Sequence, residues 1–192
     1  MIDRKKILVE VSNRHVHFSR MDLDVLFGER FRLIPVRELS QPGQFVSENS
    51  VDLIGLNGKI ERLRVLGPER KESQAEILKS DVNRLGIEAP VRLSGDLEGS
   101  PGIRVAGPLG VLNLRKGVIR SQRHLHASDE EADELGIRNG ERIGLRIGRG
   151  KREFILENIF VRKGEGHSLA IHIDKDEGDK IGLRMFGFGE II

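Results

Sequence analysis

The 192-residue chain has no cysteine, no tryptophan and no tyrosine, and it carries only eight phenylalanines. Without cysteine there is no disulfide framework, no thiolate ligand for a metal ion and no cysteine nucleophile. With so few aromatic side chains, there is little for nucleic-acid bases to stack on. We therefore expect no nucleic-acid partner.

Long hydrophobic runs are also missing. No apolar segment approaches the roughly 20 residues that a membrane-spanning helix needs, and residues 1–6 are too few and too charged for a secretory signal. We expect a cytoplasmic protein with no membrane partner. The 32 Lys and Arg residues are interspersed with 30 Asp and Glu residues, giving a formal charge of +2. This balance leaves room for a local basic pocket that binds a small anion.

The most informative feature that is present is a repeated segment. Residues 13–19 and 122–128 share the pattern R-H-x-H-x-S and together hold four of the six histidines. Side chains two residues apart on a strand point to the same face, so each copy presents two imidazoles side by side. Two imidazoles are half of a zinc site. An isolated H-x-H is more often a pair of ordinary strand histidines, but the duplication favours two half-sites for metal.

The rest of the pattern favours strands joined by tight turns. Expected strands and hairpins cover residues 6–12, residues 51–56 with 59–66 around Asn57-Gly58, and residues 142–147 with 151–156 around the turn 148–150. Ser19 and Ser128 are typical caps for short helices at 22–28 and 130–136. Both halves share this order. The sequence therefore predicts a mainly β protein with two small β-barrel domains, each capped by short α-helices and related by a degenerate internal duplication.

A third ligand is expected after each hairpin. Residues 67–76 follow the first hairpin, and they include Arg70, which is equally compatible with a surface position. The strand at 168–174 follows the second. Its alternation puts His172 on the face opposite His167, so the two cannot share a metal without a bulge. We therefore choose His172 and interpret His167 as a surface or loop histidine.

Five motifs in order along nearly the whole chain carry a resemblance to a known family. They lie at residues 11–19, 67–76 (G-P-E-R followed by Q-x-E), 92–100, 123–128 and 172–178. They closely resemble the phosphate propanoyltransferases, a type of phosphotransacylase. The resemblance implies a phosphate acyltransferase that interconverts a short-chain acyl-CoA (acetyl- or propanoyl-CoA) and phosphate with an acyl phosphate and CoA.

The same resemblance implies an architecture. It places a dinuclear zinc site between two β-barrels, with a first domain at residues 14–121 and a second at 122–192. The N-terminal strand, residues 1–13, joins the second domain. The partners it implies are acyl-CoA or CoA and phosphate or acyl phosphate, and the oligomeric state is open, a homodimer being compatible.

Carried over position by position, the resemblance also implies site residues. One zinc ion takes His15, His17 and Glu76, and the other takes His124, His126 and His172. Arg70 and Ser94 are the catalytic pair, Arg70 being associated with phosphate. The CoA pocket takes Ser12, Arg37, Arg64, Leu66 and His172, with Arg37 standing where lysine is more usual.

Two features depart from the family pattern. Asp179 stands where asparagine is usual, which brings a carboxylate near the implied CoA contact. Only about a dozen residues precede Arg14, so the amphipathic extension that targets some family members to bacterial microcompartments is not evident.

The composition agrees with direct transfer. Without cysteine an acyl-thioenzyme is excluded, and no histidine remains to act as a base for Ser94 as an acyl carrier. One alternative is a dizinc hydrolase of phosphoesters or thioesters, which would not need phosphate. Another is a non-catalytic module held by two structural zinc ions, but such sites use four ligands and are usually rich in cysteine.

Overall fold

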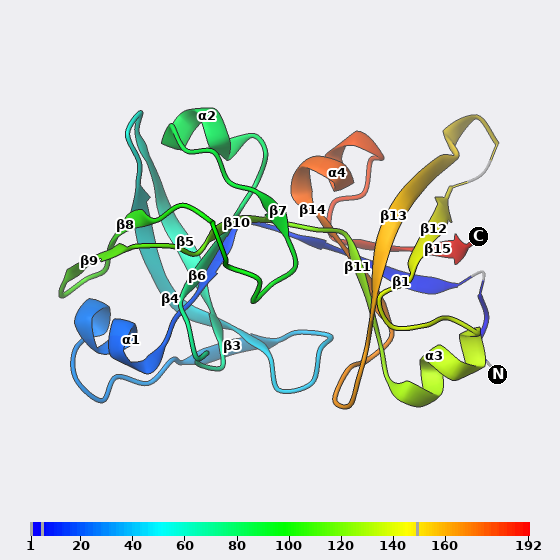
Figure 1. Ribbon diagram of the computed structural model, residues 1–192, viewed down its shortest axis with the longest axis horizontal. Helices are drawn as coiled ribbons and strands as arrows, with labels where there is room; N and C mark the ends of the chain where they lie inside the picture. Colours follow the sequence, from blue (N-terminus) through cyan, green and yellow to red (C-terminus); the bar gives the residue numbers. More distant parts are fainter. Residues whose placement is uncertain (1, 5, 149) are drawn as a thin grey trace. The chain divides into compact units, whose positions relative to one another are not determined.

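The computed structural model describes residues 2–4, 6–148 and 150–192, and it is mainly β, as the sequence predicts (Figure 1). Its strands are β1 (Ile7–Ser12), β2 (His15–His17), β3 (Pro35–Glu38), β4 (Phe45–Ile54), β5 (Lys59–Gly67), β6 (Gln74–Ile77), β7 (Val91–Arg92), β8 (Ile103–Ala106), β9 (Val111–Leu114), β10 (Val118–Ser121), β11 (His124–Ala127), β12 (Arg142–Ile147), β13 (Phe154–Lys163), β14 (Ala170–Asp174) and β15 (Phe186–Ile191). Its short α-helices are α1 (Arg20–Phe27), α2 (Asp81–Leu85), α3 (Asp129–Leu135) and α4 (Lys175–Lys180).

The chain folds as two compact units. Unit 1 consists of Met1–Ser12, Ser40–Pro42 and Gln122–Ile192, and unit 2 consists of Asn13–Leu39 and Gly43–Ser121. Each unit has its own hydrophobic core. The short segment Ser40–Pro42 therefore belongs to unit 1 although its neighbours in sequence belong to unit 2.

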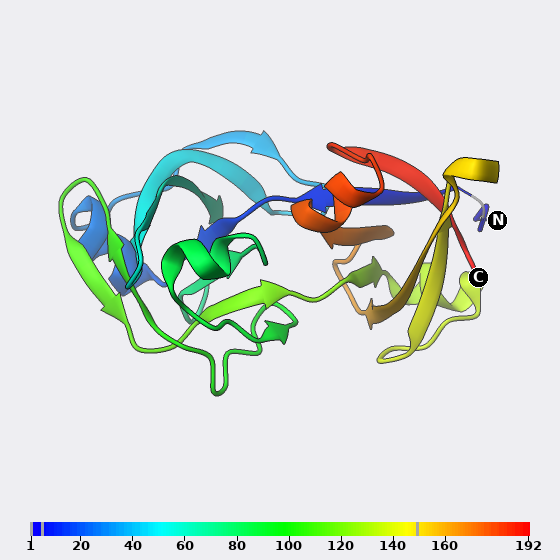
Figure 2. The ribbon, with the colours of Figure 1, turned by 90° about the horizontal axis from the view of Figure 1, so that it is seen from above.

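Unit 1 is a closed barrel with the strand order β1-β14-β11-β13-β12-β15 (Figures 1 and 2). Alternation along β1 sends Ile7 and Val9 into the core, as expected for a strand with one buried face. β1 pairs in parallel with β14 and antiparallel with β15. The N-terminal strand thus closes a barrel whose other strands come from residues 124–191.

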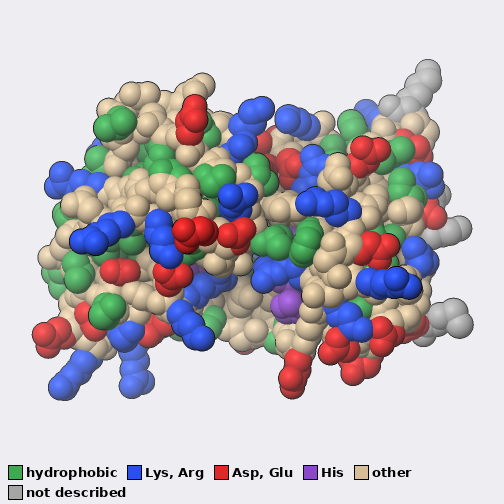
Figure 3. Space-filling model, viewed as in Figure 1, with side chains coloured by type: hydrophobic (Ala, Val, Ile, Leu, Met, Phe, Trp, Pro, Cys, Tyr) green, Lys and Arg blue, Asp and Glu red, His purple; other side chains and the backbone are tan. Residues whose placement is uncertain are grey.

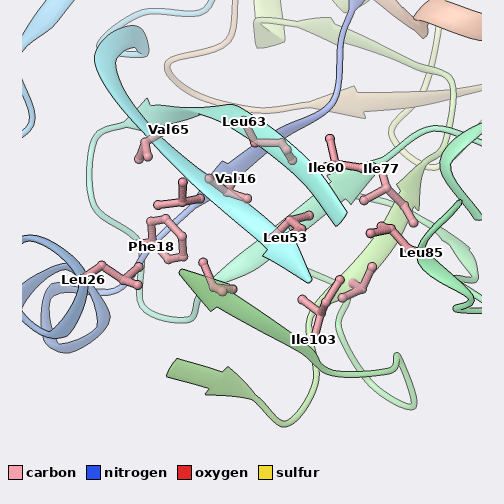
Figure 4. Close-up of a cluster of buried hydrophobic side chains, with 14 of the residues drawn as sticks. Val16, Phe18, Leu26, Leu53, Ile60, Leu63, Val65, Ile77, Leu85 and Ile103 are labelled. Atoms are coloured by element: carbon pink, nitrogen blue, oxygen red, sulfur yellow. The ribbon is translucent and has the colours of Figure 1, made fainter. Parts of the chain in front are cut away.

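Unit 2 is a nine-stranded sheet that runs in the order β7-β10-β6-β2-β5-β4-β8-β9, with β3 paired to β4. The sheet curls around a core that includes Val16, Phe18, Leu53 and Val65 (Figure 4). Because Val16 points into this core, its neighbours His15 and His17 point to the other face of β2. The core thereby fixes the direction of the first histidine pair.

The internal duplication is visible in the strand pairing. β2 pairs in parallel with β5 and antiparallel with β6, and β11 pairs in the same two ways with β13 and β14. Both hairpins contain an irregularity with a residue in the left-handed region, Arg62 at φ 54° and Asn158 at φ 60°. β3 has no counterpart among the described residues of the second copy.

The two strands that precede the histidine pairs are exchanged between the units. β1 precedes the first pair but lies in unit 1, parallel to β14, whereas β10 precedes the second pair but lies in unit 2, parallel to β6. β1 and β10 thus occupy equivalent positions. Each pairs in parallel with the strand that follows the hairpin of its unit, β14 or β6. The repeat therefore extends upstream of the arginine, through Val9 and Ser12 in one copy and Val118 and Ser121 in the other.

The local signals place most turns and caps correctly. Asn57-Gly58 joins β4 to β5, and the side chains of Ser19 and Ser128 accept hydrogen bonds at the starts of α1 and α3. The second hairpin differs from expectation, because a 3-10 turn at Gly150–Arg152 delays β13 until Phe154. Arg149, in the expected turn, lies outside the described residues.

The described helices are short, and none is long and apolar enough to cross a membrane. On the face in view, Lys and Arg side chains are interspersed with Asp and Glu side chains (Figure 3). This distribution agrees with the nearly balanced composition.

Candidate active site

In unit 2, two histidines and a carboxylate converge across neighbouring strands. β2 carries His15 and His17, and Glu76 on β6 lies directly opposite His15. One ligand atom from each of the three lies within 4.8 Å of the others. His15 Nε2 is 3.6 Å from Glu76 Oε1, and the two imidazole rings lie 5.0 Å apart at nearly a right angle. Two nitrogens and one oxygen at one point are a donor set that zinc accepts.

The pKa shifts of Glu76 and His17 favour metal binding, whereas that of His15 favours a protonated ring when no metal is bound. Burial would raise the pKa of Glu76, but the charge and hydrogen bond of His15 hold that pKa well below its usual value. Burial lowers the pKa of His17 strongly, and the neighbouring His15 and Arg70 lower it further. Burial also acts to lower the pKa of His15, but Glu76 outweighs it and the pKa is raised. An ionised carboxylate and a neutral imidazole are the protonation states in which these groups bind metal.

The first histidine of each copy is oriented by its own backbone. His15 Nδ1 is 2.8 Å from the carbonyl oxygen of Asn13, and His124 Nδ1 is 2.8 Å from that of Gln122. A carbonyl only accepts, so Nδ1–H donates in both cases. That tautomer leaves Nε2 as the nitrogen that can bind a metal.

Unit 1 holds a second cluster, made of three histidines. His124 and His126 lie on β11, and His172 on β14 lies directly opposite His124. The Nε2 atoms of His124 and His126 are 3.1 Å apart, and the three ring centres are separated by 4.7, 5.2 and 5.2 Å. Imidazoles that bind one tetrahedral zinc ion through Nε2 have ring centres about 5 Å apart, given Zn–N distances of about 2.0–2.1 Å. The spacing of these three rings fits a shared ion.

His126 is held neutral in this cluster. Burial, followed by the neighbouring histidines His124 and His172, lowers its pKa to about 2. Its Nδ1 is buried and has no hydrogen-bond partner in the described part of the chain. A neutral ring with one nitrogen directed at the neighbouring imidazoles fits a metal ligand.

His167 lies closer to this cluster than its strand position suggested. It lies in the loop before β14, as a loop histidine, but its ring centre is 4.4 Å from that of His126. Its Nδ1 donates to the carbonyl oxygen of Arg162 at 3.0 Å. Strand alternation could not find this contact, because it says nothing about how a loop folds back.

A half-buried hydrogen-bond network joins Glu76 to Arg70 through Gln74 and Ser94. Arg70 Nη1 donates to Ser94 Oγ at 2.6 Å, and Gln74 Nε2 donates to Ser94 Oγ and to Glu76 Oε1, both at 2.7 Å. The backbone N–H of Gly95 donates to Gln74 Oε1 at 3.0 Å. A hydrogen bond from the Ser94 hydroxyl is among the contacts that lower the pKa of Glu76. Ser94 therefore orients a carboxylate and a guanidinium. Gln74, whose role the sequence did not indicate, holds Glu76 directly and Arg70 only through Ser94.

Arg14 and Arg123, the arginines of the two repeated segments, make equivalent contacts with acidic residues. Arg14 Nε donates to Asp81 at 2.8 Å, and Arg123 Nε donates to Glu177. Each acid stands five residues after a candidate third ligand, Glu76 or His172. The arginine thus ties the histidine pair to the helix that follows the facing strand, in both units.

The residues expected around CoA fall into both units. Arg64 lies on β5 opposite His15, with its side chain bonded to the carbonyl oxygen of Glu48 at 2.6 Å, and Leu66 follows on the same strand. Arg37 is exposed on β3 in unit 2, whereas Ser12 ends β1 in unit 1.

Asp179, the departure from the family pattern, is engaged locally on α4. Lys175 Nζ lies 2.6 and 2.8 Å from its two carboxylate oxygens. The carboxylate is therefore paired with a lysine of its own helix.

Comparison with known proteins identifies the family of the chain. The sequence profile of the phosphate propanoyltransferase family matches residues 8–184. A phosphate propanoyltransferase of Thermotoga maritima is 47% identical over 186 residues, covering 97% of this chain and 87% of the relative. Proteins of the same name from Alkaliphilus metalliredigens and Rhodopseudomonas palustris are 40% and 39% identical, covering 97% and 95% of this chain and 88% and 80% of the relatives.

These matches define an acyltransferase. The chain belongs to the phosphate propanoyltransferase family.

Proposed function

We propose that the protein transfers a short-chain acyl group, acetyl or propanoyl, between CoA and phosphate, using two zinc ions. Acyl-CoA and phosphate are converted to acyl phosphate and CoA, or the reverse. The observation that carries this proposal is the convergence of His15, His17 and Glu76 at one point, linked to Arg70 through Ser94. Family membership supports the same reaction, because the relatives are named phosphate propanoyltransferases.

The residues divide into two ligand sets, one in each unit. His15, His17 and Glu76 would hold one ion, and His124, His126 and His172 the other. Zinc at such sites supplies a Lewis acid that polarises a thioester carbonyl and a soft partner for a departing thiolate. The protein contributes the protonation states: His17 and His126 stay neutral and Glu76 stays ionised because of burial and their neighbours.

Arg70 is the residue we assign to phosphate. Its planar guanidinium presents a fork of N–H donors that matches the oxygens of a phosphate group. The backbone N–H of Arg70 donates to the carbonyl oxygen of Phe18 at 2.9 Å, and Ser94 fixes the side chain. The phosphate group would therefore be held at a defined position beside Glu76.

The transfer is direct in this proposal. A phosphate oxygen attacks the thioester carbonyl, a C–O bond to phosphate forms, and the C–S bond breaks with the electron pair leaving on sulfur. The chain has no cysteine to carry the acyl group. The oxygen of Ser94 already accepts from Arg70 and Gln74, which disfavours it as a nucleophile. For the CoA pocket we propose Ser12, Arg37, Arg64, Leu66 and His172.

An assay of CoA release from propanoyl-CoA tests the proposal. The wild-type protein should release CoA in phosphate buffer, with acyl phosphate formed in equal amount and trapped as a hydroxamate. It should release almost none in a phosphate-free buffer, and treatment with a chelator should abolish the reaction. Release of CoA at the same rate without phosphate would instead identify a dizinc hydrolase.

A further inference from the structure

Each histidine cluster belongs to a row of residues that face one another across neighbouring strands. The row in unit 2 is Arg64, His15, Glu76 and Ile119, on strands β5, β2, β6 and β10. The row in unit 1 is Phe160, His124, His172 and Glu10, on strands β13, β11, β14 and β1. The two rows correspond position by position, because the strands correspond.

The last members of the two rows are equivalent in sequence as well. Glu10 stands five residues before His15, and Ile119 stands five residues before His124. Ile119 is fully buried. At this position of the repeat, unit 1 has the carboxylate of Glu10 and unit 2 has the apolar side chain of Ile119. The carboxylate of unit 2, Glu76, lies on the strand next to Ile119.

The contacts of Glu10 match those of the carboxylate in the other cluster. Glu10 Oε2 is 3.7 Å from His172 Nε2, and Glu76 Oε1 is 3.6 Å from His15 Nε2. Two atoms that bind the same tetrahedral zinc ion at about 2.0–2.2 Å are separated by roughly 3.3–3.6 Å, so both distances lie at or just beyond the upper end of this range. Ser40 Oγ donates a hydrogen bond to Glu10. Carboxylates that bind metal are usually held by such a second contact.

We propose that Glu10 is a fourth protein ligand of the metal ion held by His124, His126 and His172. The proposal rests on the proposed function in that it takes a metal ion at this cluster as given. Nothing in the repeat pattern assigned a role to Glu10. Three observations indicate Glu10 Oε2 as the ligand atom. They are the place of Glu10 at the end of the row, its distance from His172 and the hydrogen bond from Ser40.

A fourth ligand makes the two metal sites unlike each other. Zinc sites with four protein ligands are closed, whereas catalytic sites keep three protein ligands and one open position. The unit 2 site has His15, His17 and Glu76, and it is linked to Arg70. The unit 2 residues would then hold the ion that keeps an open position for a substrate oxygen or sulfur.

Metal titration of three variants of the full chain tests the role of Glu10. Glu10→Gln keeps the shape of the side chain, and Glu10→Ile makes the position like Ile119. Glu190→Gln is the matched control, because Glu190 lies on β15 of the same barrel and pairs with Arg146. Each protein is stripped and reloaded with Zn²⁺ under chelator competition, and separately with Co²⁺ to record the visible absorption spectrum. Circular dichroism confirms that each variant is folded.

The wild type and Glu190→Gln should each bind two ions. The affinities and the Co²⁺ spectrum of Glu190→Gln should equal those of the wild type. In both Glu10 variants we expect one of the two ions to bind about 100-fold more weakly and the Co²⁺ spectrum to change. The ion that remains tightly bound should be lost when His17→Ala is added. Two ions bound by Glu10→Gln and Glu10→Ile within about twofold of the wild type would overturn this role and leave the proposed function standing. A folded wild type that binds no metal would overturn both.

Discussion

At the scale of the residue, Arg70 is held by Ser94 and is the group that we assign to phosphate. Arg70→Lys keeps the charge but loses the planar fork. The loss of one charge-assisted hydrogen bond, about 1.5–3 kcal/mol, should raise the KM for phosphate about 10- to 100-fold. The KM for acyl-CoA should change little. Steady-state kinetics with each substrate varied checks this, with Arg104→Lys on β8 as the control. A rise in the KM for acyl-CoA alone would contradict the role of Arg70.

Ser94 distinguishes direct transfer from an acyl-enzyme mechanism. If Ser94 only orients Arg70 and Glu76, Ser94→Ala should lower kcat/KM by about 10- to 100-fold, as for other groups that position ligands. No burst of CoA release should precede the steady state in the wild type. A burst of one CoA per chain, lost in Ser94→Ala together with all activity, would show a covalent acyl-serine.

His126 predicts how the metal-free protein responds to acid. Its pKa is lowered to about 2 in the folded state, mainly by burial, from the ordinary value of 6.5 that applies to the unfolded chain. The unfolded chain therefore takes up the proton first, and stability is lost as the pH falls from about 6.5 towards 2. Urea midpoints measured after metal removal should fall between pH 8 and pH 5. His126→Asn should reduce that fall, and an unchanged pH dependence would contradict the assignment.

At the scale of the element, the start of α3 has a capping box. Ser128 accepts from the N–H of Glu131, whose side chain accepts from the N–H of Ser128. Ser128→Ala should cost about 1 kcal/mol of stability and lower the Tm by about 2–4 °C. Asp133→Ala, on the exposed side of the same helix, should have less than half that effect because surface ion pairs contribute little. Thermal unfolding of both variants checks the cap, and equal shifts would contradict it.

The elements that the sequence indicated are those with a local signal. Asn57-Gly58 sets a hairpin by its own conformational preference, and Ser19 and Ser128 cap helices through contacts three residues away. The histidine pairs and His172 were found because alternation and repetition are both local. The repeat is longer than the segments 13–19 and 122–128 that the sequence indicated, because it continues upstream into β1 and β10.

Other elements could not be predicted, because their partners lie far away in the sequence. Nothing local tells β1 to pair with β14, more than 150 residues later, and only the family resemblance indicated that strand exchange. Nothing in the sequence indicated the contact between Glu10 and His172, for the same reason. The same holds for the contact between His167 and His126. These contacts depend on a parallel strand pairing in one case and on a returning loop in the other.

At the scale of the whole molecule, the duplication produces two units that are similar in topology and different in chemistry. Each unit contains a histidine pair, a facing strand with a third donor and an arginine that ties them to the next helix. Unit 2 combines two histidines with a carboxylate and is linked to Arg70. Unit 1 combines three histidines with Glu10 nearby. One repeated arrangement thus produces two clusters of candidate metal ligands with different side chains.

The most direct test is the number of metal ions per folded chain, measured on the wild type and on two single variants. We predict two zinc ions in the wild type, one in His17→Ala and one in His126→Ala, because each histidine pair belongs to its own ion. Both variants should also lose nearly all acyl transfer to phosphate. One ion or none per folded wild-type chain, or two ions in either variant, would contradict the presence of two separate zinc sites.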